Sequence, residues 1–302
     1  MLHPRRTNVT PSQQFEAMDV FIQLLQDTIC AALEAEDSVS FREDTWQRPE
    51  GGGGCSRVLE GGATIEKGGV NISRIHGEMS EELAKQLRTE RTPFAVCGLS
   101  LVIHPQSPRV PTTHMNVRYF ETEAGRAWFG GGIDLTPYYP HLEDFRKFHQ
   151  VLKDTCESVR PGSYEGYKTW CDEYFTIRHR QEMRGIGGIF FDDLDGNDPA
   201  NFALVQAVGE VFLSAYLPML QARKHEPFTE ADRQFQLVRR GRYIEFNLVY
   251  DRGTLFGLRS NGRIESIFMS LPPVVHYPYD WHPEPGSPHV DLMQYYQPQT
   301  WA

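Results

Sequence analysis

Two stretches of strict alternation constrain the fold of this chain more than any other feature. In the first, VCGLSLVIH at 96–104, one face is wholly apolar and carries Leu99, Leu101 and Ile103, opposite Ser100, Val102 and His104. In the second, HMNVRYFE at 114–121, the same alternation sets Met115, Val117 and Tyr119 against His114, Asn116, Arg118 and Phe120. Successive side chains of a β-strand point to opposite faces, so a period of two is typical of half-buried strands. We therefore expect a sheet with an apolar face that other elements cover.

Helices and further strands are indicated on both sides of these stretches. Apolar residues at helical spacing predict helices from Gln13 to Leu33 and, later in the chain, at 141–157, 165–181 and 199–224, with a short helix from Ser80. Thr10, Pro11 and Gln13 supply an N-cap, a first-turn proline and a capping-box glutamine for the first helix. Between 41 and 76, short β-like pieces alternate with glycines, including GGGG at 51–54, which is typical of strands joined by turns and flexible loops.

The segment 241–271, GRYIEFNLVYDRGTLFGLRSNGRIESIFMSL, predicts three strands joined by turns at DRGT and SNG. Consecutive hairpins form an antiparallel sheet, and the predicted helices must cover it. The 302 residues contain no repeat, linker or break in composition. We therefore predict an α+β fold and a single domain over 1–302.

The overall charge limits the partners that this chain can bind. With 30 lysines and arginines against 40 acidic residues, the formal net charge is −10 at pH 7. Because binding along a nucleic-acid backbone needs a basic face, we expect no nucleic-acid partner, and an anionic ligand must find a local basic site. The 5 cysteines contain no C-x-x-C pair, and no apolar run approaches the ~18 residues of a membrane span. We expect reduced thiols, no transmembrane segment and a cytoplasmic location.

The polar face of the stretch 114–121 is the first candidate for chemistry. A half-buried strand usually turns its polar side chains to water, so His114, Asn116 and Arg118 can form a simple solvated face. The same residue types also suit a ligand, because histidine exchanges a proton near neutral pH and arginine grips a carboxylate through two parallel hydrogen bonds. The second interpretation predicts an acidic ligand held on the sheet, and the pattern alone leaves both open.

Four histidines raise a metal-dependent alternative. His104, His114, His149 and His179 lie far apart in sequence, without the spacing that places metal ligands on one helical face. His149 follows Phe145 at helical spacing and suits a buried, hydrogen-bonded histidine. His179 is flanked by arginines that would repel a cation. We therefore expect no metal site; if one exists, these four histidines are its candidate ligands.

The stretch WFGGGIDLTPYY, at 128–139, sets three glycines beside Asp134. The triplet has neither the Lys-Ser/Thr of a phosphate-binding loop nor G-x-G-x-x-G spacing. One interpretation is a tight bend with Asp134 as a turn former before Leu-Thr-Pro. The other is a bare backbone that lets a large flat ligand approach Asp134, walled by the aromatic rings of Trp128, Phe129, Tyr138 and Tyr139.

Longer strings in the chain match a known family. They are VIHPQSPRVPTTHMNVRYFE, WFGGGIDLTPYY, YKTWCDEYFTIRHRQEMRGIGGIFFDD, RRGRYIEFNLVYDRGTLFGL and RIESIFMSLPP. In this order they resemble the oxygen-dependent coproporphyrinogen III oxidases of haem biosynthesis, over residues 13–293. The resemblance implies a large flat antiparallel sheet sandwiched between α-helices, and a homodimer. It also implies oxidative decarboxylation of two propionates of coproporphyrinogen III to vinyl groups, which yields protoporphyrinogen IX, CO₂ and H₂O₂ with oxygen as co-substrate and no cofactor.

The resemblance also assigns roles to residues of this chain. His114 matches the family's proton-donating catalytic histidine, and Asp134 its essential aspartate. Substrate-binding positions fall on Ser100, Asn116, Val117, Arg118, Gly257, Leu258 and Arg259. We expect Arg118, which shares a face with His114, to act in catalysis as well. Segments 58–67 and 240–275 resemble the family's dimerisation regions.

A porphyrinogen offers a reason for the glycines beside Asp134. Its four pyrrole N–H groups point inward, so one central carboxylate can accept several of them. Asp134 is the candidate, with the bare backbone of 130–132 clearing the approach. Two alternatives stay open: a tetrapyrrole-binding protein without catalysis, which needs no proton transfer by His114 or Asp134, and a metal-dependent enzyme that uses the four histidines.

Overall fold

A seven-stranded sheet forms the centre of the protein. The computed structural model describes residues 11–86, 89–259 and 262–302. The strand order is β1-β2-β3-β4-β5-β6-β9, and every neighbouring pair is antiparallel. The strands are β1 (Arg42–Gln47), β2 (Gly52–Glu60), β3 (Ile65–Glu78), β4 (Pro93–Pro105), β5 (Thr112–Thr122), β6 (Ala127–Thr136) and β9 (Gly188–Asp195).

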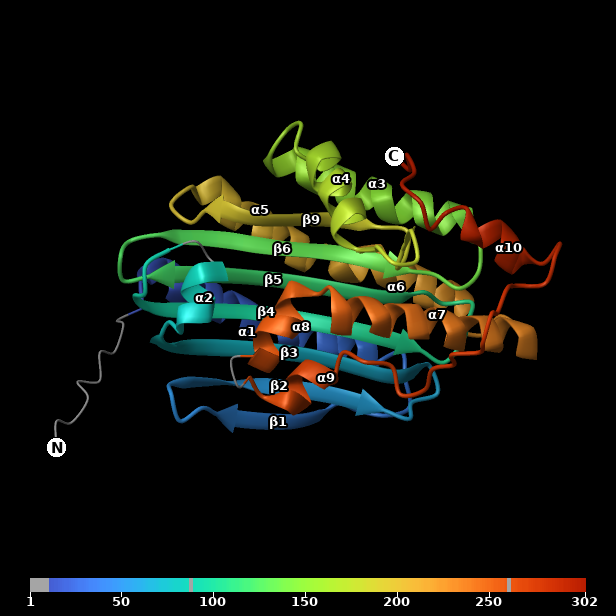
Figure 1. Cartoon of the computed structure of the whole chain (residues 1–302), viewed down its shortest axis with the longest axis horizontal. Helices are drawn as coiled ribbons and strands as arrows, with labels where there is room; N and C mark the ends of the chain where they lie inside the picture. Colours follow the sequence, from blue (N-terminus) through green and yellow to red (C-terminus); the bar gives the residue numbers. More distant parts are fainter. Residues whose placement is uncertain (1–10, 87–88, 260–261) are drawn as a thin grey trace.

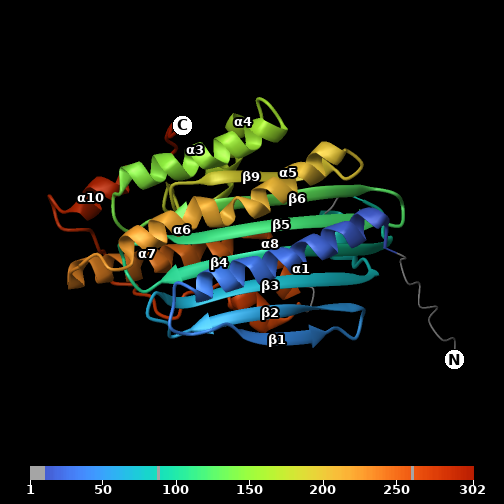
Figure 2. The ribbon, with the colours of Figure 1, turned by 180° about the vertical axis from the view of Figure 1, so that it is seen from behind.

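Helices cover both faces of this sheet. On the face seen in Figure 1, which we call the front face, lie α2 (Glu81–Gln86), α7 (Glu230–Val249), α8 (Arg252–Arg259) and α9 (Ile264–Phe268). On the opposite, back face lie α1 (Gln13–Glu34), α5 (Pro199–Glu210) and α6 (Phe212–Arg223), as Figure 2 shows. The β9 edge adjoins α3 (Leu142–Val159) and α4 (Tyr164–Tyr174), and the remaining elements are β7 (Thr176–Ile177), β8 (Glu182–Met183) and α10 (Pro288–Met293). The predicted α+β fold, with its antiparallel sheet between helices, is confirmed.

The main core lies between the back face and its helices. The predicted alternation holds along β4 and β5, where the residues of the apolar face are almost completely buried: Leu99, Leu101, Ile103, Met115, Val117 and Tyr119. The apolar stripe of α1, from Phe15 to Leu33, packs into the same cluster. Burial of this continuous apolar layer fixes the register of the strands, because a slip by one residue would turn every core side chain to the other face.

The described residues of the segment 241–271 form the end of α7, α8 and α9, so the three strands predicted there are wrong. Thr229 and Asp232 form a capping box, in which each side chain accepts from the other residue's backbone N–H, at 3.2 and 2.7 Å. Buried residues then recur at helical spacing along α7: Phe235, Arg239, Tyr243 and Phe246. The antiparallel sheet is therefore built from strands that precede this segment, and α7, α8 and α9 cover its front face.

The glycine triplet at 130–132 lies in the middle of β6, so the predicted tight bend is wrong. The strand continues from Ala127 to Thr136, and Asp134 pairs with His114 of β5. The strands predicted between 41 and 76 are present as β1, β2 and β3, and the glycines 52–54 lie within β2 rather than in a turn.

Helix boundaries differ from the predictions by smaller amounts. The first helix begins at Gln13 with Ser12 as its N-cap, because Ser12 Oγ accepts from the Phe15 N–H at 3.1 Å. Thr10, the predicted cap, lies outside the described residues. The helix predicted at 165–181 ends at Tyr174, where the short strands β7 and β8 follow.

One stretch among the described residues, Pro199–Arg223, has the length and mean hydropathy, 1.5, of a membrane-crossing helix. The sequence analysis had expected none. The stretch comprises α5 and α6, and 50% of its most apolar window is buried inside the protein. Leu204, Val208 and Phe212 lie in the main core. The apolar composition of this stretch is thus accounted for by packing on the back face.

Candidate active site

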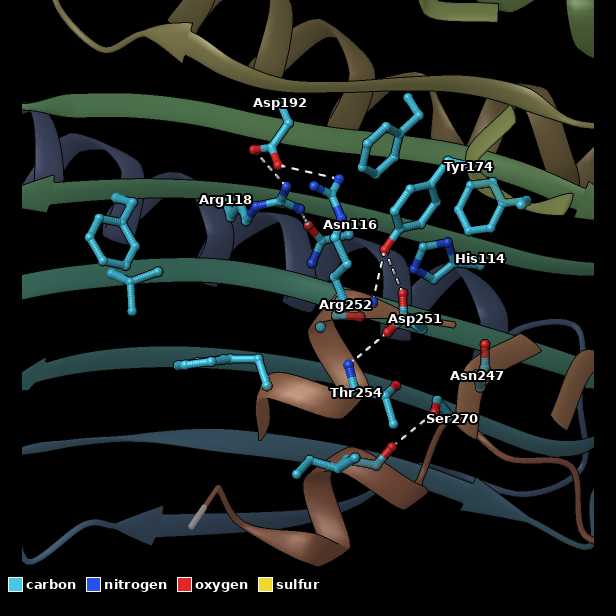
Figure 3. Close-up of a pocket in the computed structure, with 18 of the residues that line it drawn as sticks. His114, Asn116, Arg118, Tyr174, Asp192, Asn247, Asp251, Arg252, Thr254 and Ser270 are labelled. Atoms are coloured by element: carbon cyan, nitrogen blue, oxygen red, sulfur yellow. Dashed lines mark hydrogen bonds and ion pairs between the residues drawn. The ribbon is translucent and has the colours of Figure 1, made fainter. Parts of the chain in front are cut away.

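A cavity of about 770 Å³ lies between the front face of the sheet and the helices above it. This volume falls within the range of roughly 300–1,000 Å³ that is typical of small-molecule sites. Strands β4, β5 and β6 form its floor, while α8, α9 and the end of α7 form its roof (Figure 3). The end of α4 and strand β9 close one side, with Trp170, Tyr174 and Phe190 among the lining residues.

Strand register brings several predicted site residues together on this floor. Ser100 pairs with Asn116 and Val102 with His114, and directly paired residues of antiparallel strands share a face. Along β5 the front face therefore presents His114, Asn116, Arg118 and Phe120 in sequence, and all four line the cavity. Of the two interpretations of the polar face, an enclosed site fits better than a solvated surface.

Other predicted substrate-binding residues lie elsewhere. Val117 belongs to the back-face core and is completely buried. Gly257 and Leu258 lie in α8 without lining the cavity, and Leu258 is largely exposed. A Cβ on Gly257 would lie 2.8 Å from Cδ1 of Ile267, so this glycine allows α8 and α9 to pack closely. Arg259 ends α8, and its side chain lies outside the part of the chain that the structure describes.

A buried ion pair between Asp134 and Arg184 holds the imidazole of His114 in place. Its Nδ1 lies 2.8 Å from Oδ1 of Asp134. The guanidinium of Arg184 binds the same carboxylate through two contacts, Nη2 to Oδ1 at 2.8 Å and Nε to Oδ2 at 3.1 Å. Asp134 and Arg184 are each only 2% exposed. The rings of Phe175, Tyr243 and Phe246 surround the guanidinium at 3.9 to 4.9 Å.

The surroundings of Asp134 keep it ionised. Burial acts to raise the pKa of this carboxyl, but Arg184 and His114 more than offset that effect and hold the pKa below its ordinary value. An ionised carboxylate only accepts hydrogen bonds, so Nδ1 of His114 carries the proton that it shares with Asp134. The tautomer and ring orientation of His114 are thereby fixed, and Nε2 is left to act on a bound molecule.

Side chains, rather than open space for a ligand, lie beside Asp134 and Gly130. Asp134 is not among the cavity-lining residues, because His114 and Arg184 occupy its carboxylate oxygens. A Cβ on Gly130 would lie 2.6 Å from Nη2 of Arg118 and 2.6 Å from Oδ1 of Asp192. The bare backbone at Gly130 therefore makes room for side chains that cross the sheet. In this arrangement Asp134 reaches the cavity through its two partners, His114 and Arg184, which both line it.

Arg118 is the cation that the front face presents to the cavity. Its Nη1 donates to Oδ1 of Asn116 at 2.7 Å, and its Nη2 lies 2.8 Å from Oδ1 of Asp192. The side chain remains 29% exposed. A second arginine, Arg252 of α8, approaches the other oxygen of Asp192 at 3.8 Å (Figure 3). Two guanidinium groups thus share one carboxylate, which a ligand carboxylate can partly replace.

Sequence reasoning missed the residues that complete the site. Asp251 accepts from the Tyr174 hydroxyl at 2.9 Å and from the Thr254 N–H at 2.7 Å, so it caps α8 and ties it to α4 (Figure 3). The D-x-x-T pattern at 251–254 was a readable signal for such a cap. Arg184 and Asp192 gave no local signal, because their partners lie far away along the chain.

The four histidines named for a metal site do not converge. His104 is buried between Thr112 Oγ1 and the Ser270 carbonyl, and burial lowers its pKa well below the ordinary value. His149 contacts the Tyr164 hydroxyl, and burial lowers its pKa to about 3. His179 binds Glu245 at 2.7 Å. Among the described residues, no group of three or more His, Cys, Asp or Glu side chains is arranged to hold a metal ion.

Comparison with protein families agrees with the resemblance noted in the sequence. A family model described as coproporphyrinogen III oxidase matches residues 17–301 of this chain. The matched range includes the whole sheet and every residue of the cavity. Members of this family act on coproporphyrinogen in haem biosynthesis. On the strength of a match over nearly its whole length, this chain belongs to the coproporphyrinogen III oxidase family.

Proposed function

We propose that this protein catalyses the oxygen-dependent oxidative decarboxylation of two propionates of coproporphyrinogen III, which gives protoporphyrinogen IX. The observation that carries the proposal is a pair of functional groups on one strand face. They are His114, oriented by Asp134, and Arg118, four residues further along the strand. Each reaction converts one propionate, one O₂ and one proton into a vinyl group, one CO₂ and one H₂O₂. Both electrons pass from the substrate to oxygen, so the balance requires no other oxidant.

Arg118 binds the reacting end of the substrate in this proposal. A propionate carboxylate takes over the hydrogen bonds that Asp192 now accepts from the guanidinium, and two parallel N–H donors fix the plane of the carboxylate. This local positive site offsets the formal net charge of −10 that would otherwise repel a substrate with four carboxylates. The carboxylate leaves as CO₂ when the Cα–carboxylate bond breaks.

His114 supplies the proton that the reaction consumes. Its Nε2 donates to the reduced oxygen, which departs as H₂O₂, and the ring is reprotonated from solvent. Asp134 stabilises the orientation of the imidazole and the positive charge that it carries before donation. The pyrroles of a porphyrinogen are electron-rich, so the substrate itself provides the electrons for oxygen.

Two other functions remain to be separated from this one. A tetrapyrrole carrier would use the same cavity and Arg118 but would not need the buried support of His114. A metal-dependent enzyme would use the four histidines. Each of them contacts a different partner, Thr112, Asp134, Tyr164 or Glu245, which gives this alternative no support.

We further propose that the protein acts as a cytoplasmic homodimer. Strand β1 forms one edge of the sheet and is largely exposed, and an unpaired edge strand is a surface that partners commonly cover. The segment 240–275 was expected to contribute hairpins to the dimer, but its described residues form the end of α7 and the helices α8 and α9. Light scattering at micromolar concentration is expected to give twice the mass of one chain, and a monomeric mass would contradict the proposal. Cell fractionation tests the location.

The test of the reaction uses purified protein after exhaustive chelation. With coproporphyrinogen III under air, we expect divinyl product, one O₂ consumed and one H₂O₂ formed per vinyl group. Under nitrogen we expect none. Conversion without oxygen, or conversion restored only by adding one metal, would overturn the proposed chemistry. Binding of the porphyrinogen without any conversion would favour the carrier.

A further inference from the structure

The cavity has two chemically different ends. From His114 to Arg118 along β5, the lining carries hydrogen-bonding and charged side chains: Ser100, Asn116, Arg118, Asp192, Asn247 and Asp251. At the other end the lining is apolar: Leu83, Phe94, Val96, Phe120, Trp128 and Phe256. His114 and Phe120 are six residues apart on one strand face, which corresponds to roughly 20 Å. A tetrapyrrole that enters the cavity therefore meets both environments.

Three aromatic rings build a continuous wall at the apolar end. Phe120 stacks on Phe94 at a centroid distance of 5.2 Å and on Trp128 at 4.3 Å, with interplanar angles of 7° and 19°. All three are less than 9% exposed, and Leu83 of α2 packs against them. Strand register holds the wall in place, since Phe120 pairs with both Val96 and Trp128. The three rings are thus held in fixed positions beside the cavity.

The charged groups nearest to this wall are already paired. Among the described lining residues, these include Arg118, which stands two residues before Phe120 on the same strand face and is paired with Asp192 at 2.8 Å. Arg126 and Asp193 form a second ion pair, at 2.7 Å. The Arg126 guanidinium lies 4.6 Å from the centre of the Trp128 ring, and both charged side chains are well exposed. A carboxylate placed between the rings would lose its water, and it would have to displace Asp192 or Asp193 to reach a cation. Methyl or vinyl groups carry no charge, so burying them there has no such desolvation cost.

We propose that the Phe94–Phe120–Trp128 wall is the subsite for the uncharged substituents of the macrocycle, its methyl groups and the first vinyl group, and controls the second decarboxylation. This inference rests on the proposed function. Each pyrrole of the substrate carries a methyl and a propionate group, and the first reaction replaces one propionate by a vinyl group. The wall binds the new vinyl group, which keeps the monovinyl tricarboxylate in the cavity while the second propionate reaches Arg118 and His114. The wall thus determines how often the monovinyl intermediate dissociates before the second decarboxylation.

Val96→Asn and Phe120→Leu test this assignment. Val96 is only partly buried, so an amide can be placed at the wall with little risk to folding. Phe120→Leu breaks the ring stack while the site stays apolar. With limiting coproporphyrinogen III and excess oxygen, we expect either variant to raise the ratio of released monovinyl intermediate to divinyl product about tenfold. The rate of the first decarboxylation should change by less than about threefold.

A binding measurement keeps this test independent of turnover. Quenching of tryptophan fluorescence gives Kd for two oxidised probes, coproporphyrin III and the monovinyl tricarboxylic porphyrin. In both variants we expect Kd to rise about tenfold for the monovinyl probe and less than about threefold for coproporphyrin III. Equal changes for the two probes, or none for the monovinyl probe, would overturn the subsite.

Matched controls separate the wall from general loss of packing. Val159→Asn changes a partly buried valine at the end of α3, and Phe202→Leu changes a ring that stacks on Phe129 at 5.7 Å on the back side of the sheet. Neither residue lines the cavity. Both controls should keep the wild-type product ratio, and a shifted ratio in them would contradict the assignment. If wild-type protein makes no vinyl product at all, the proposed function fails, while the binding measurement still tests the wall.

Discussion

The two faces of the sheet are made from alternate residues of the same strands, yet one face packs into the core and the other lines the cavity. On the back face, Leu99, Leu101 and Val117 are completely buried under α1 and its neighbours. On the front face, Ser100 and Asn116 line a cavity of about 770 Å³. The comparison teaches that close packing on one side fixes the position of chemically active side chains on the other. Substitutions on the back face should therefore alter stability, whereas those on the front face should alter turnover.

The largest combined effect on stability and turnover is expected for Asp134→Asn, because Asp134 both pairs with the buried Arg184 and orients His114. The change leaves the Arg184 guanidinium buried without a charged partner, so we expect a loss of about 3–5 kcal/mol in the free energy of unfolding. The imidazole of His114 also loses its anionic support, so kcat should fall by about 10²–10³-fold with a smaller effect on KM. Urea unfolding and steady-state kinetics of the folded variant measure the two effects.

Asp232→Asn is the matched control for that variant. Asp232 is also a buried carboxylate, bound by His289 at 3.0 Å and Arg109 at 3.3 Å, but it lies outside the cavity. We expect this control to lose stability and to keep a wild-type kcat. A normal kcat in Asp134→Asn as well would mean that the buried ion pair serves folding alone.

Leu101→Ala tests the back face by itself. Removing a completely buried leucine from a packed core typically costs about 2–5 kcal/mol. The free energy of unfolding should fall by that amount, while kcat measured well below the melting temperature should stay within about twofold of wild type. A loss of kcat of tenfold or more in the folded variant would show that the two faces are not separable.

Arg118→Lys tests the front face without removing its charge. Lysine lacks the planar fork that donates to Asn116 and Asp192, so a propionate would be held less firmly or at a different angle. We expect kcat/KM to fall by about 10- to 100-fold and the melting temperature to change little, because Arg118 is partly exposed. Unchanged kcat/KM would remove Arg118 from substrate binding.

The effect that is smallest at neutral pH is a pH dependence of stability from His149, a buried residue outside the cavity. Burial lowers its pKa to about 3 in the folded protein, whereas an unfolded chain binds the proton near pH 6.5. Only the unfolded state is protonated between these values, so the stability is fully present above pH 6.5 and falls as the pH drops, by up to about 1.4 kcal/mol per unit. His149→Gln removes this dependence, and the stability advantage of wild type over the variant should shrink on acidification. Urea titrations at several pH values measure it, and a constant difference would contradict this assignment.

The sequence was sufficient to predict which strand residues lie on each face of the sheet. It was not sufficient to predict the helices that cover the front face. The alternation of β4 and β5 predicted correctly which residues enter the core, because a single apolar face repeats every two residues. In α7 the buried face includes Arg239 and Arg240, which bind Glu182 and Glu66. Two buried arginines hide the helical period of the apolar residues, so the β-branched and aromatic residues of 241–250 favoured strands.

The candidate site was predictable only in part, for a related reason. His114, Asn116 and Arg118 stand on one strand face, and this was visible as alternation. The ion pair that supports His114 was not visible, because Arg184 is 50 residues from Asp134 along the chain and reaches it where β9 pairs with β6. The glycines were misread because Gly130 gives room to Arg118 and Asp192, two side chains from different strands. Contacts of this kind depend on tertiary structure and leave no local pattern.

The rate of vinyl formation by His114→Gln most directly tests the claim that chemistry occurs on the front face. The variant keeps a polar side chain at the cavity floor but cannot transfer a proton as imidazole does. With saturating coproporphyrinogen III and oxygen, and with folding verified by circular dichroism, the account predicts a fall in kcat of about 10²–10⁴-fold. Binding of coproporphyrin III should stay within about threefold of wild type. A kcat within threefold of wild type would contradict the account.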